Sequence, residues 1–129
     1  MGRPQSVQPT QVELQILRVL WETGSATVGE IHKSLLAEKG TNYSTTVKML
    51  SVMLDKGLVK RDEATRPHVY RPVAPQKTTQ QRMLRDLIQK AYNGSASSLV
   101  LQALSSQKAS KAELAKIREL LDELQGDES

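Results

Sequence analysis

Residues 42 to 72 read NYSTTVKMLSVMLDKGLVKRDEATRPHVYRP, and this stretch decides the fold. Its first half predicts a short amphipathic helix over residues 44–56, because apolar residues recur in it at helical spacing. One face carries Val47, Leu50, Met53 and Leu54, and the opposite face carries Ser44, Lys48, Ser51 and Asp55. We expect Ser44 to cap the start of this helix and Gly57 to end it in a left-handed conformation.

A β-hairpin is predicted directly after this helix. Two short β-prone runs, residues 58–61 and 68–71, are separated by the turn-rich residues 62–67. A helix followed by a basic hairpin is typical of a winged helix-turn-helix. Such a domain places its second helix in the DNA major groove, and its hairpin touches the flanking backbone.

Two capping boxes predict helices before this stretch. Thr10 with Glu13 opens the first helix, which ends near Gly24, and Thr27 with Glu30 opens the second. The apolar positions expected to pack these helices together are Leu14, Leu17, Leu20, Trp21, Val28, Ile31 and Leu35.

Two short links complete the N-terminal domain. Ser25 and Ala26 can pair with the hairpin as a third strand, and residues 38–41 form the turn into the helix over 44–56. The order of helix, turn and helix is the one that a helix-turn-helix requires. We therefore predict a disordered arm over residues 1–9 and a winged-helix domain over residues 10–75.

Three short helices are predicted in the C-terminal part, residues 76–129. They follow a linker that has Pro72 at one end and Pro75 at the other. Helical patterns run over residues 79–92, over 95–104, and from a third capping box at Ser110 to the acidic tail. Their apolar stripes include Leu84, Leu87, Ile88, Leu99, Leu114, Ile117 and Leu121. Three such helices are too few for a sound core, so these stripes either fold back on the winged domain or, as we favour, pair with a second copy. The predicted class is mostly α with a small β-hairpin wing, followed by a three-helix dimerisation domain.

Composition narrows the classes of function. The 129 residues contain no cysteine, which excludes disulfides and thiolate metal sites, and no apolar run is long enough to span a membrane. We expect a cytoplasmic protein without membrane insertion, cofactor or metal. His32 and His68 are the only histidines, and neither has a metal or triad spacing. We therefore predict that the protein is not an enzyme and that His32 is a helix surface residue.

Residues suited to double-stranded DNA lie on the helix over 44–56 and on the hairpin. The net charge is +4, and its excess is local, because five Lys and Arg face two acids between Lys56 and Arg71. Lys48 can donate to guanine, and the methyl groups of Thr45 or Val52 can contact a thymine methyl. The candidate DNA-binding residues are Tyr43, Ser44, Thr45, Lys48, Ser51, Arg61, Arg66 and His68.

Two alternatives stay open at this point. Tyr43 is as well suited to packing at the turn as to contacting a phosphate. A winged helix can also serve as a protein-interaction module without DNA binding. Such a module predicts no salt-dependent affinity for duplex DNA, whereas a repressor should lose affinity steeply as salt rises.

Five pieces of the chain, in order, resemble the penicillinase repressors, the BlaI/MecI group. They are ELQIL at 13–17 with LW at 20–21, YSTTV at 43–47, LDKGLV at 54–59, HVY at 68–70 and YNGS at 92–95. The resemblance implies a homodimeric repressor with an N-terminal winged helix and a C-terminal helical dimerisation domain. It also implies a palindromic operator, and release when a membrane-bound sensor protease causes cleavage within the dimerisation domain.

Residue by residue, the resemblance implies base reading by Ser44, Thr45 and Lys48. The family commonly has a basic residue where this chain has Val52. Its scissile bond aligns near Gln102 and Ala103, where the cleaved members resemble Asn-Phe. The copper-responsive relatives have a Cys-rich C-terminus, which this chain lacks.

Overall fold

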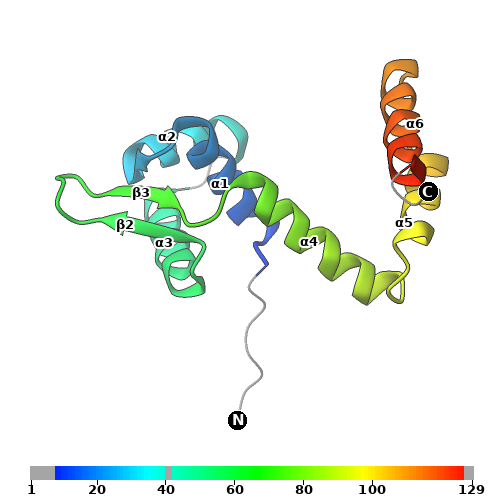
Figure 1. The fold of residues 1–129 in the computed structure, drawn as a ribbon. Helices are drawn as coiled ribbons and strands as arrows, with labels where there is room; N and C mark the ends of the chain where they lie inside the picture. The colour runs from blue at the N-terminus through cyan, green and yellow to red at the C-terminus, as the bar shows by residue number, and fades with distance from the viewer. Residues whose placement is uncertain (1–7, 40–41, 127–129) are drawn as a thin grey trace, which may run out of the picture. The chain divides into compact units, whose positions relative to one another are not determined.

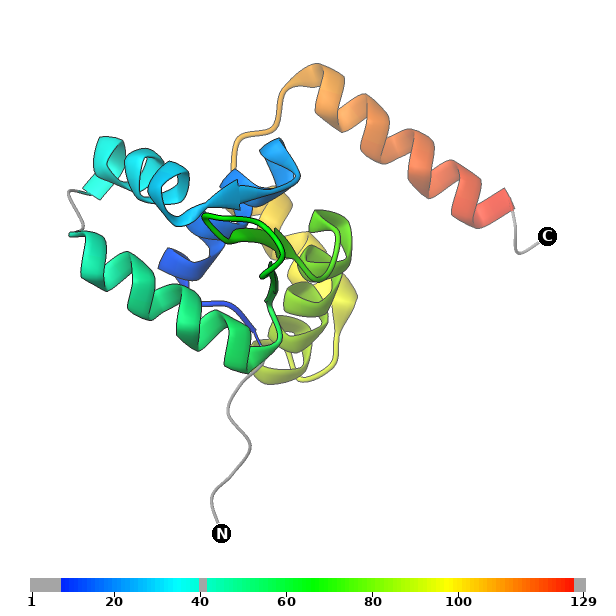
Figure 2. The ribbon, with the colours of Figure 1, turned by 90° about the vertical axis from the view of Figure 1, so that its left-hand side faces the viewer.

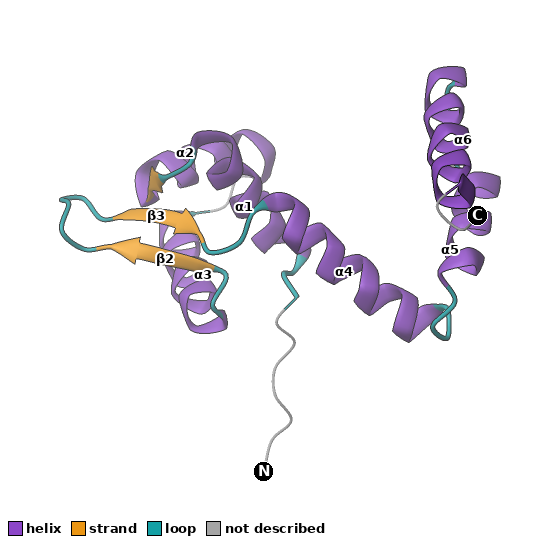
Figure 3. Ribbon diagram, viewed as in Figure 1, coloured by secondary structure: helices purple, strands orange, loops and turns teal. Residues whose placement is uncertain are grey.

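The computed structural model describes residues 8–39 and 42–126, except for the side chains of residues 36–39. Residues 1–7 of the predicted arm and residues 40 and 41 of the predicted turn lie outside this range. The elements are α1 (Gln11–Thr23), β1 (Ala26–Thr27), α2 (Val28–Lys39), α3 (Tyr43–Lys56), β2 (Val59–Asp62), β3 (Val69–Pro72), α4 (Gln76–Ala91), α5 (Ala96–Ser106) and α6 (Lys111–Gly126). Figures 1 and 3 label all of them except β1. This order confirms the predicted class, mostly α with a small β-hairpin wing.

The predicted capping boxes start α1 and α2. Thr10 Oγ1 accepts a hydrogen bond from the Glu13 amide at 3.2 Å, and Glu13 Oε1 accepts one from the Thr10 amide at 2.9 Å. Thr27 and Glu30 repeat the arrangement at α2, with distances of 3.2 and 2.8 Å. Gly24 ends α1 with a φ of 85°, a conformation that favours glycine. Each box satisfies amides that the first turn of a helix leaves without partners.

The strands form one antiparallel sheet in the order β1-β3-β2, so the predicted third strand is present and β3 is central. Tyr70 of β3 pairs with Ala26 on one side and with Arg61 on the other. Tyr70 is 6% exposed, whereas its neighbour Val69 is half-buried. Successive residues of a strand face opposite sides, so Tyr70 is the one that faces the core. Pro72 is the last residue of this central strand, where a missing amide costs least.

The core of the N-terminal unit lies between the sheet and the first three helices. Helices α2 and α3 are consecutive in the chain, and both lie beside the sheet (Figures 1 and 2). Its buried hydrophobic residues are Ile16, Leu17, Leu20, Ala26, Ile31, Leu35, Leu50, Met53, Val59 and Tyr70. The placement of Val47 in the core is wrong, because Val47 is 43% exposed and Thr46 is fully buried instead. Ile16, absent from the predicted stripe, is fully buried, while Leu14 and Trp21 are only partly buried.

The chain divides into two compact units, Met1–Leu84 and Arg85–Ser129, and the division falls within α4. This helix begins at Gln76 rather than near residue 79, directly after Pro75. Asn93 and Gly94 follow it with φ values of 52° and 82°, which confirms the predicted stop.

Two further helices belong to the second unit. The hydroxyl of Ser95 caps α5 by accepting from the Ser98 amide at 3.1 Å, and the helix continues to Ser106. Ser110 and Glu113 form the third predicted capping box at α6. Neither α5 nor α6 contains a buried residue. Of the helices described, none is long and apolar enough to cross a bilayer.

Candidate nucleic-acid interface

One face of α3 is exposed along the whole helix. Thr46, Leu50 and Met53 bury the opposite face against the core. The exposed residues are Ser44, Thr45, Val47, Lys48, Ser51, Val52 and Asp55. The four residues predicted to meet base edges, Ser44, Thr45, Lys48 and Ser51, therefore share one solvent-facing surface.

The N-cap of α3 lies two residues before the predicted one. Asn42, rather than Ser44, is the N-cap, since its side-chain Oδ1 accepts from the Thr45 amide at 2.9 Å. The Ser44 hydroxyl donates to the same Oδ1 at 3.0 Å. Asn and Ser are equally good caps, so sequence preference alone did not separate them. The consequence is that Ser44 lies within the first turn, on the exposed face.

A contact between α2 and α3 involves His32, which is half-buried rather than a surface residue. His32 Nδ1 lies 3.1 Å from Thr46 Oγ1, and Thr46 Oγ1 donates to the Asn42 carbonyl at 3.4 Å. The hydroxyl proton is thus used, so Thr46 accepts from Nδ1–H of His32. The ring of His32 also meets that of Tyr43 edge-on, with 5.4 Å between centroids. Tyr43 therefore packs at the turn and still exposes 53% of its surface.

The far end of α3 is held by an ion pair that sequence reasoning missed. Lys56 Nζ lies 2.7 Å from Glu13 Oε1, and the two side chains are only 12% and 7% exposed. Lys56 also donates to the Gln8 carbonyl at 3.5 Å, beside the buried Pro9. Burial raises the pKa of Glu13, but hydrogen bonds from Lys56 and Thr10 and the charge of Lys56 outweigh it and hold the pKa below its ordinary value. Lys56 therefore does not belong to the exposed basic excess.

The wing carries its own carboxylates beside the cations. Arg61 Nε donates to Glu63 Oε2 at 3.0 Å, and Arg61 Nη2 contacts the same oxygen. These hydrogen bonds and the charge of Arg61 lower the pKa of Glu63. Arg66 Nη1 lies 2.7 Å from His68 Nε2, and because the guanidinium has only donors, this imidazole nitrogen accepts. Arg61 is one of the predicted DNA contacts on the wing. Its charge is thus partly neutralised by Glu63 in the unbound protein.

A pair of cations on the wing was not among the predicted site residues. Lys60 and Arg71 are directly paired across β2 and β3, so their side chains leave the same face of the sheet. A hollow of about 180 Å³ is lined by Lys60, Arg61, Asp62 and Arg71. Arg71 Nη2 lies 3.9 Å from Asp62 Oδ2, and Arg71 is exposed whereas Asp62 is half-buried. Both Lys60 and Arg71 lie in the β-prone runs predicted for the hairpin, 58–61 and 68–71, and this position was the signal that could have found the pair.

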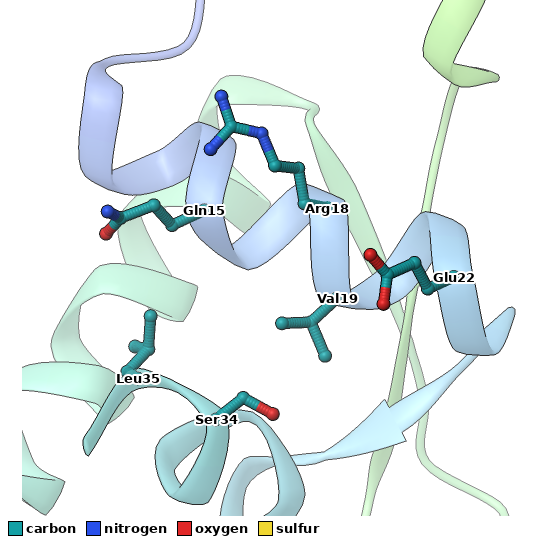
Figure 4. Close-up of a pocket in the computed structure, with 6 residues that line it drawn as sticks. All are labelled: Gln15, Arg18, Val19, Glu22, Ser34 and Leu35. Atoms are coloured by element: carbon teal, nitrogen blue, oxygen red, sulfur yellow. The ribbon is translucent and has the colours of Figure 1, made fainter. Parts of the chain in front are cut away.

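A second hollow, of about 220 Å³, lies between α1 and α2 (Figure 4). Its lining residues are Gln15, Arg18, Val19, Glu22, Ser34 and Leu35. The hydroxyl of Ser34 donates to the Glu30 carbonyl at 3.3 Å. The hollow is not part of the exposed face of α3.

The residues predicted to form a dimer are unburied in the single chain. Leu84 and Leu87 of α4 are each 47% exposed, and Leu114 and Leu121 of α6 are 38% and 52% exposed. The other three predicted residues, Ile88, Leu99 and Ile117, are half-buried. Gln102 and Ala103, at the predicted cleavage position, are both exposed within helix α5.

Comparison with known proteins identifies the family to which this sequence is similar. A family model described as "Penicillinase repressor" matches residues 9–123. The penicillinase repressor of Bacillus licheniformis is 25% identical over 116 residues, 90% of this chain and 91% of that protein. The methicillin resistance regulatory protein MecI of Staphylococcus aureus (strain N315) is 20% identical over 113 residues, 88% of this chain and 92% of that protein. Since the match extends over both units, the chain belongs to the penicillinase repressor family of transcriptional repressors.

Proposed function

We propose that this protein is a homodimeric transcriptional repressor that binds a palindromic operator in double-stranded DNA. The observation that carries the proposal is the exposed face of α3, which a helix-turn-helix would present to the major groove. The helix is held at both ends, by Asn42 and His32 at its start and by the Lys56–Glu13 pair at its end. A helix held in this way loses little freedom on binding.

The chemistry of this surface suits base edges. Lys48 can donate to O6 and N7 of guanine, and the hydroxyls of Ser44, Thr45 and Ser51 can donate or accept. The wing supplies Lys60, Arg66 and Arg71 for phosphates, which fix the position of the protein without specifying sequence. The two surfaces together provide the parts of a specific DNA contact.

Twofold symmetry is supported by the exposed leucines of the second unit. The second unit on its own buries no residue of α5 or α6. Its apolar stripes therefore need another surface to pack against, and the exposed fraction reaches 66% at Leu101. Pairing with a second copy covers these stripes and places two reading helices on one duplex. The second contact is then effectively intramolecular, which raises affinity by about 10² to 10⁴ over one half-site.

A salt titration tests the proposal against the protein-interaction alternative. The full chain is used to select bound sequences from random duplex DNA, and the affinity for the selected duplex is measured from about 50 to 200 mM salt. We expect log affinity to fall linearly with log salt, with a slope near −0.9 for each phosphate contacted. The absence of a selected duplex, or a flat salt dependence, would favour the protein-interaction module.

Lys48→Ala tests the reading role of α3 on the same duplex. We expect it to weaken specific binding by about 1 to 3 kcal/mol and to change non-specific binding much less. Lys116→Ala, which removes the same charge from an exposed position on α6, serves as the matched control. Equal losses of specific and non-specific affinity in Lys48→Ala would assign this lysine to the DNA backbone.

Glu63→Gln tests the wing. We expect tighter operator binding and a steeper salt slope, by about one unit, because Arg61 is released to contact a phosphate. Affinity is measured across the same salt range, with Glu119→Gln on α6 as a control for net charge. A rise of equal size in both variants would mean that net charge, and not the release of Arg61, is responsible.

A further inference from the structure

Two valines interrupt the polar face of α3. Val47 and Val52 are 43% and 42% exposed, although each could have been a polar residue at no cost to the core. A β-branched residue at an exposed helix position also lowers helix propensity slightly, so these valines do not serve the folding of the helix. Their exposure places two apolar side chains on the surface proposed to meet DNA.

The positions of the valines on the helix are informative. At about 100° per residue, Val47 and Val52 lie about 140° apart around the axis. The strip formed by Ser44, Lys48 and Ser51 runs between them. Val47 lies four residues before Ser51, and Val52 four residues after Lys48, so each valine is the direct neighbour of a polar residue. One apolar side chain thus borders each side of the polar strip.

Among the base edges in the major groove, the apolar group is the C5 methyl of thymine. Lys48, Ser44 and Ser51 can hydrogen-bond to base edges, but hydroxyls discriminate weakly among them. A valine beside each polar group can distinguish thymine from the other bases, which the hydroxyls cannot do. The methyl groups of the valine are removed from water by an apolar contact only where a thymine methyl faces them. Branched side chains also hold their methyls in few rotamers, which makes the contact position-specific.

We propose that Val47 and Val52 are specificity-determining residues, each reading the methyl group of a thymine that borders the bases met by Lys48 and Ser51. The inference rests on the proposed function, because it names what the reading helix recognises. It predicts that each half-site contains at least two thymines whose methyl groups contribute to affinity.

Replacement of thymine by uracil isolates the methyl group, because uracil keeps every hydrogen-bonding group of the base. The full chain is titrated with the selected duplex, in which one thymine at a time is replaced by uracil in a single half-site. We expect about fourfold weaker binding at the two read positions, the factor that corresponds to burial of one methyl group. The remaining positions should show no change.

Matched variants assign each penalty to a side chain. In Val47→Ala, the loss of affinity caused by uracil should vanish at one of the two thymines and persist at the other. Val52→Ala should show the converse. Both variants should fold, because alanine is the better helix former and neither valine is buried. Val73→Ala, at a 49% exposed valine outside α3, should keep both penalties.

The outcomes separate this inference from the proposed function. Specific binding without a uracil penalty at any thymine overturns the inference alone. A penalty at both thymines that persists in Val47→Ala or in Val52→Ala removes that valine from the reading surface. Failure to select any duplex overturns the proposed function, and the inference falls with it.

Discussion

Ile117→Glu is expected to yield a monomer that binds the operator at least about 100-fold more weakly than the parent chain. Ile117 lies at the centre of the apolar stripe of α6, between Leu114 and Leu121 along the helix. Pairing of two copies through this stripe would bury the new carboxylate without a partner, which a hydrophobic interface does not tolerate. Loss of the dimer removes the intramolecular second contact, so the oligomeric state and operator affinity should change together.

Ala115→Glu is the matched control for this variant. It adds the same charge to the same helix, two residues away, at an exposed position on the opposite side of the helix. Sedimentation or light scattering gives the mass of each variant, and operator titration gives its affinity. We expect Ala115→Glu to behave as the parent chain does. A dimeric Ile117→Glu protein, or a monomeric one with unchanged affinity, would contradict the proposed assembly.

The N-terminal unit was predictable from sequence because each element has local signals at both ends. Capping boxes at Thr10 and Thr27 and the left-handed Gly57 mark the helices, and the turn-rich residues 62–67 mark the hairpin. These signals act within a few residues of each other. The element order therefore agrees with the prediction, and boundaries differ by one to three residues.

Side-chain partners distant in sequence were not predictable. Glu13 and Lys56 are 43 positions apart, and each has a sufficient local explanation, as a capping residue and as a basic residue beside the wing. Val47 was assigned to the apolar face, although Thr46 is buried instead, because a helix with one buried threonine fits the apolar periodicity nearly as well as one with a buried valine. His32 was assigned to the helix surface for a different reason, because its partner Thr46 lies on another helix.

The proposed reading of DNA by α3 requires that the helix be firmly anchored. Lys56→Met is expected to lower the free energy of unfolding of the N-terminal unit by about 3 to 5 kcal/mol, because it leaves the buried carboxylate of Glu13 without its partner. Glu13→Gln/Lys56→Met removes both charges and keeps a side-chain oxygen for the Thr10 amide. We expect the double variant to recover most of the loss, so the two changes are strongly non-additive.

The pH dependence of stability provides an independent test of the same pair. Lys56 and Thr10 hold the folded-state pKa of Glu13 below its ordinary value of 4.5. The stabilisation is therefore present above that value and is lost as pH falls through the folded-state pKa. In Lys56→Met, the loss of the hydrogen bond and charge of Lys56 should raise the pKa of Glu13, so the carboxyl is neutral at higher pH than in the parent chain and the difference in stability between the two narrows on acidification.

Trp21 makes this measurable in the intact protein. It is the only tryptophan, it packs against the core of the N-terminal unit, and its Nε1 donates to the Ala74 carbonyl at 2.9 Å. Its fluorescence should report urea unfolding of that unit between about pH 4 and pH 7. A constant difference between Lys56→Met and the parent chain over this range would show that Lys56 stabilises the fold by packing rather than by its charge. Because the pair fixes the last turn of α3 to the first turn of α1, its loss should weaken operator binding even where the variant remains folded.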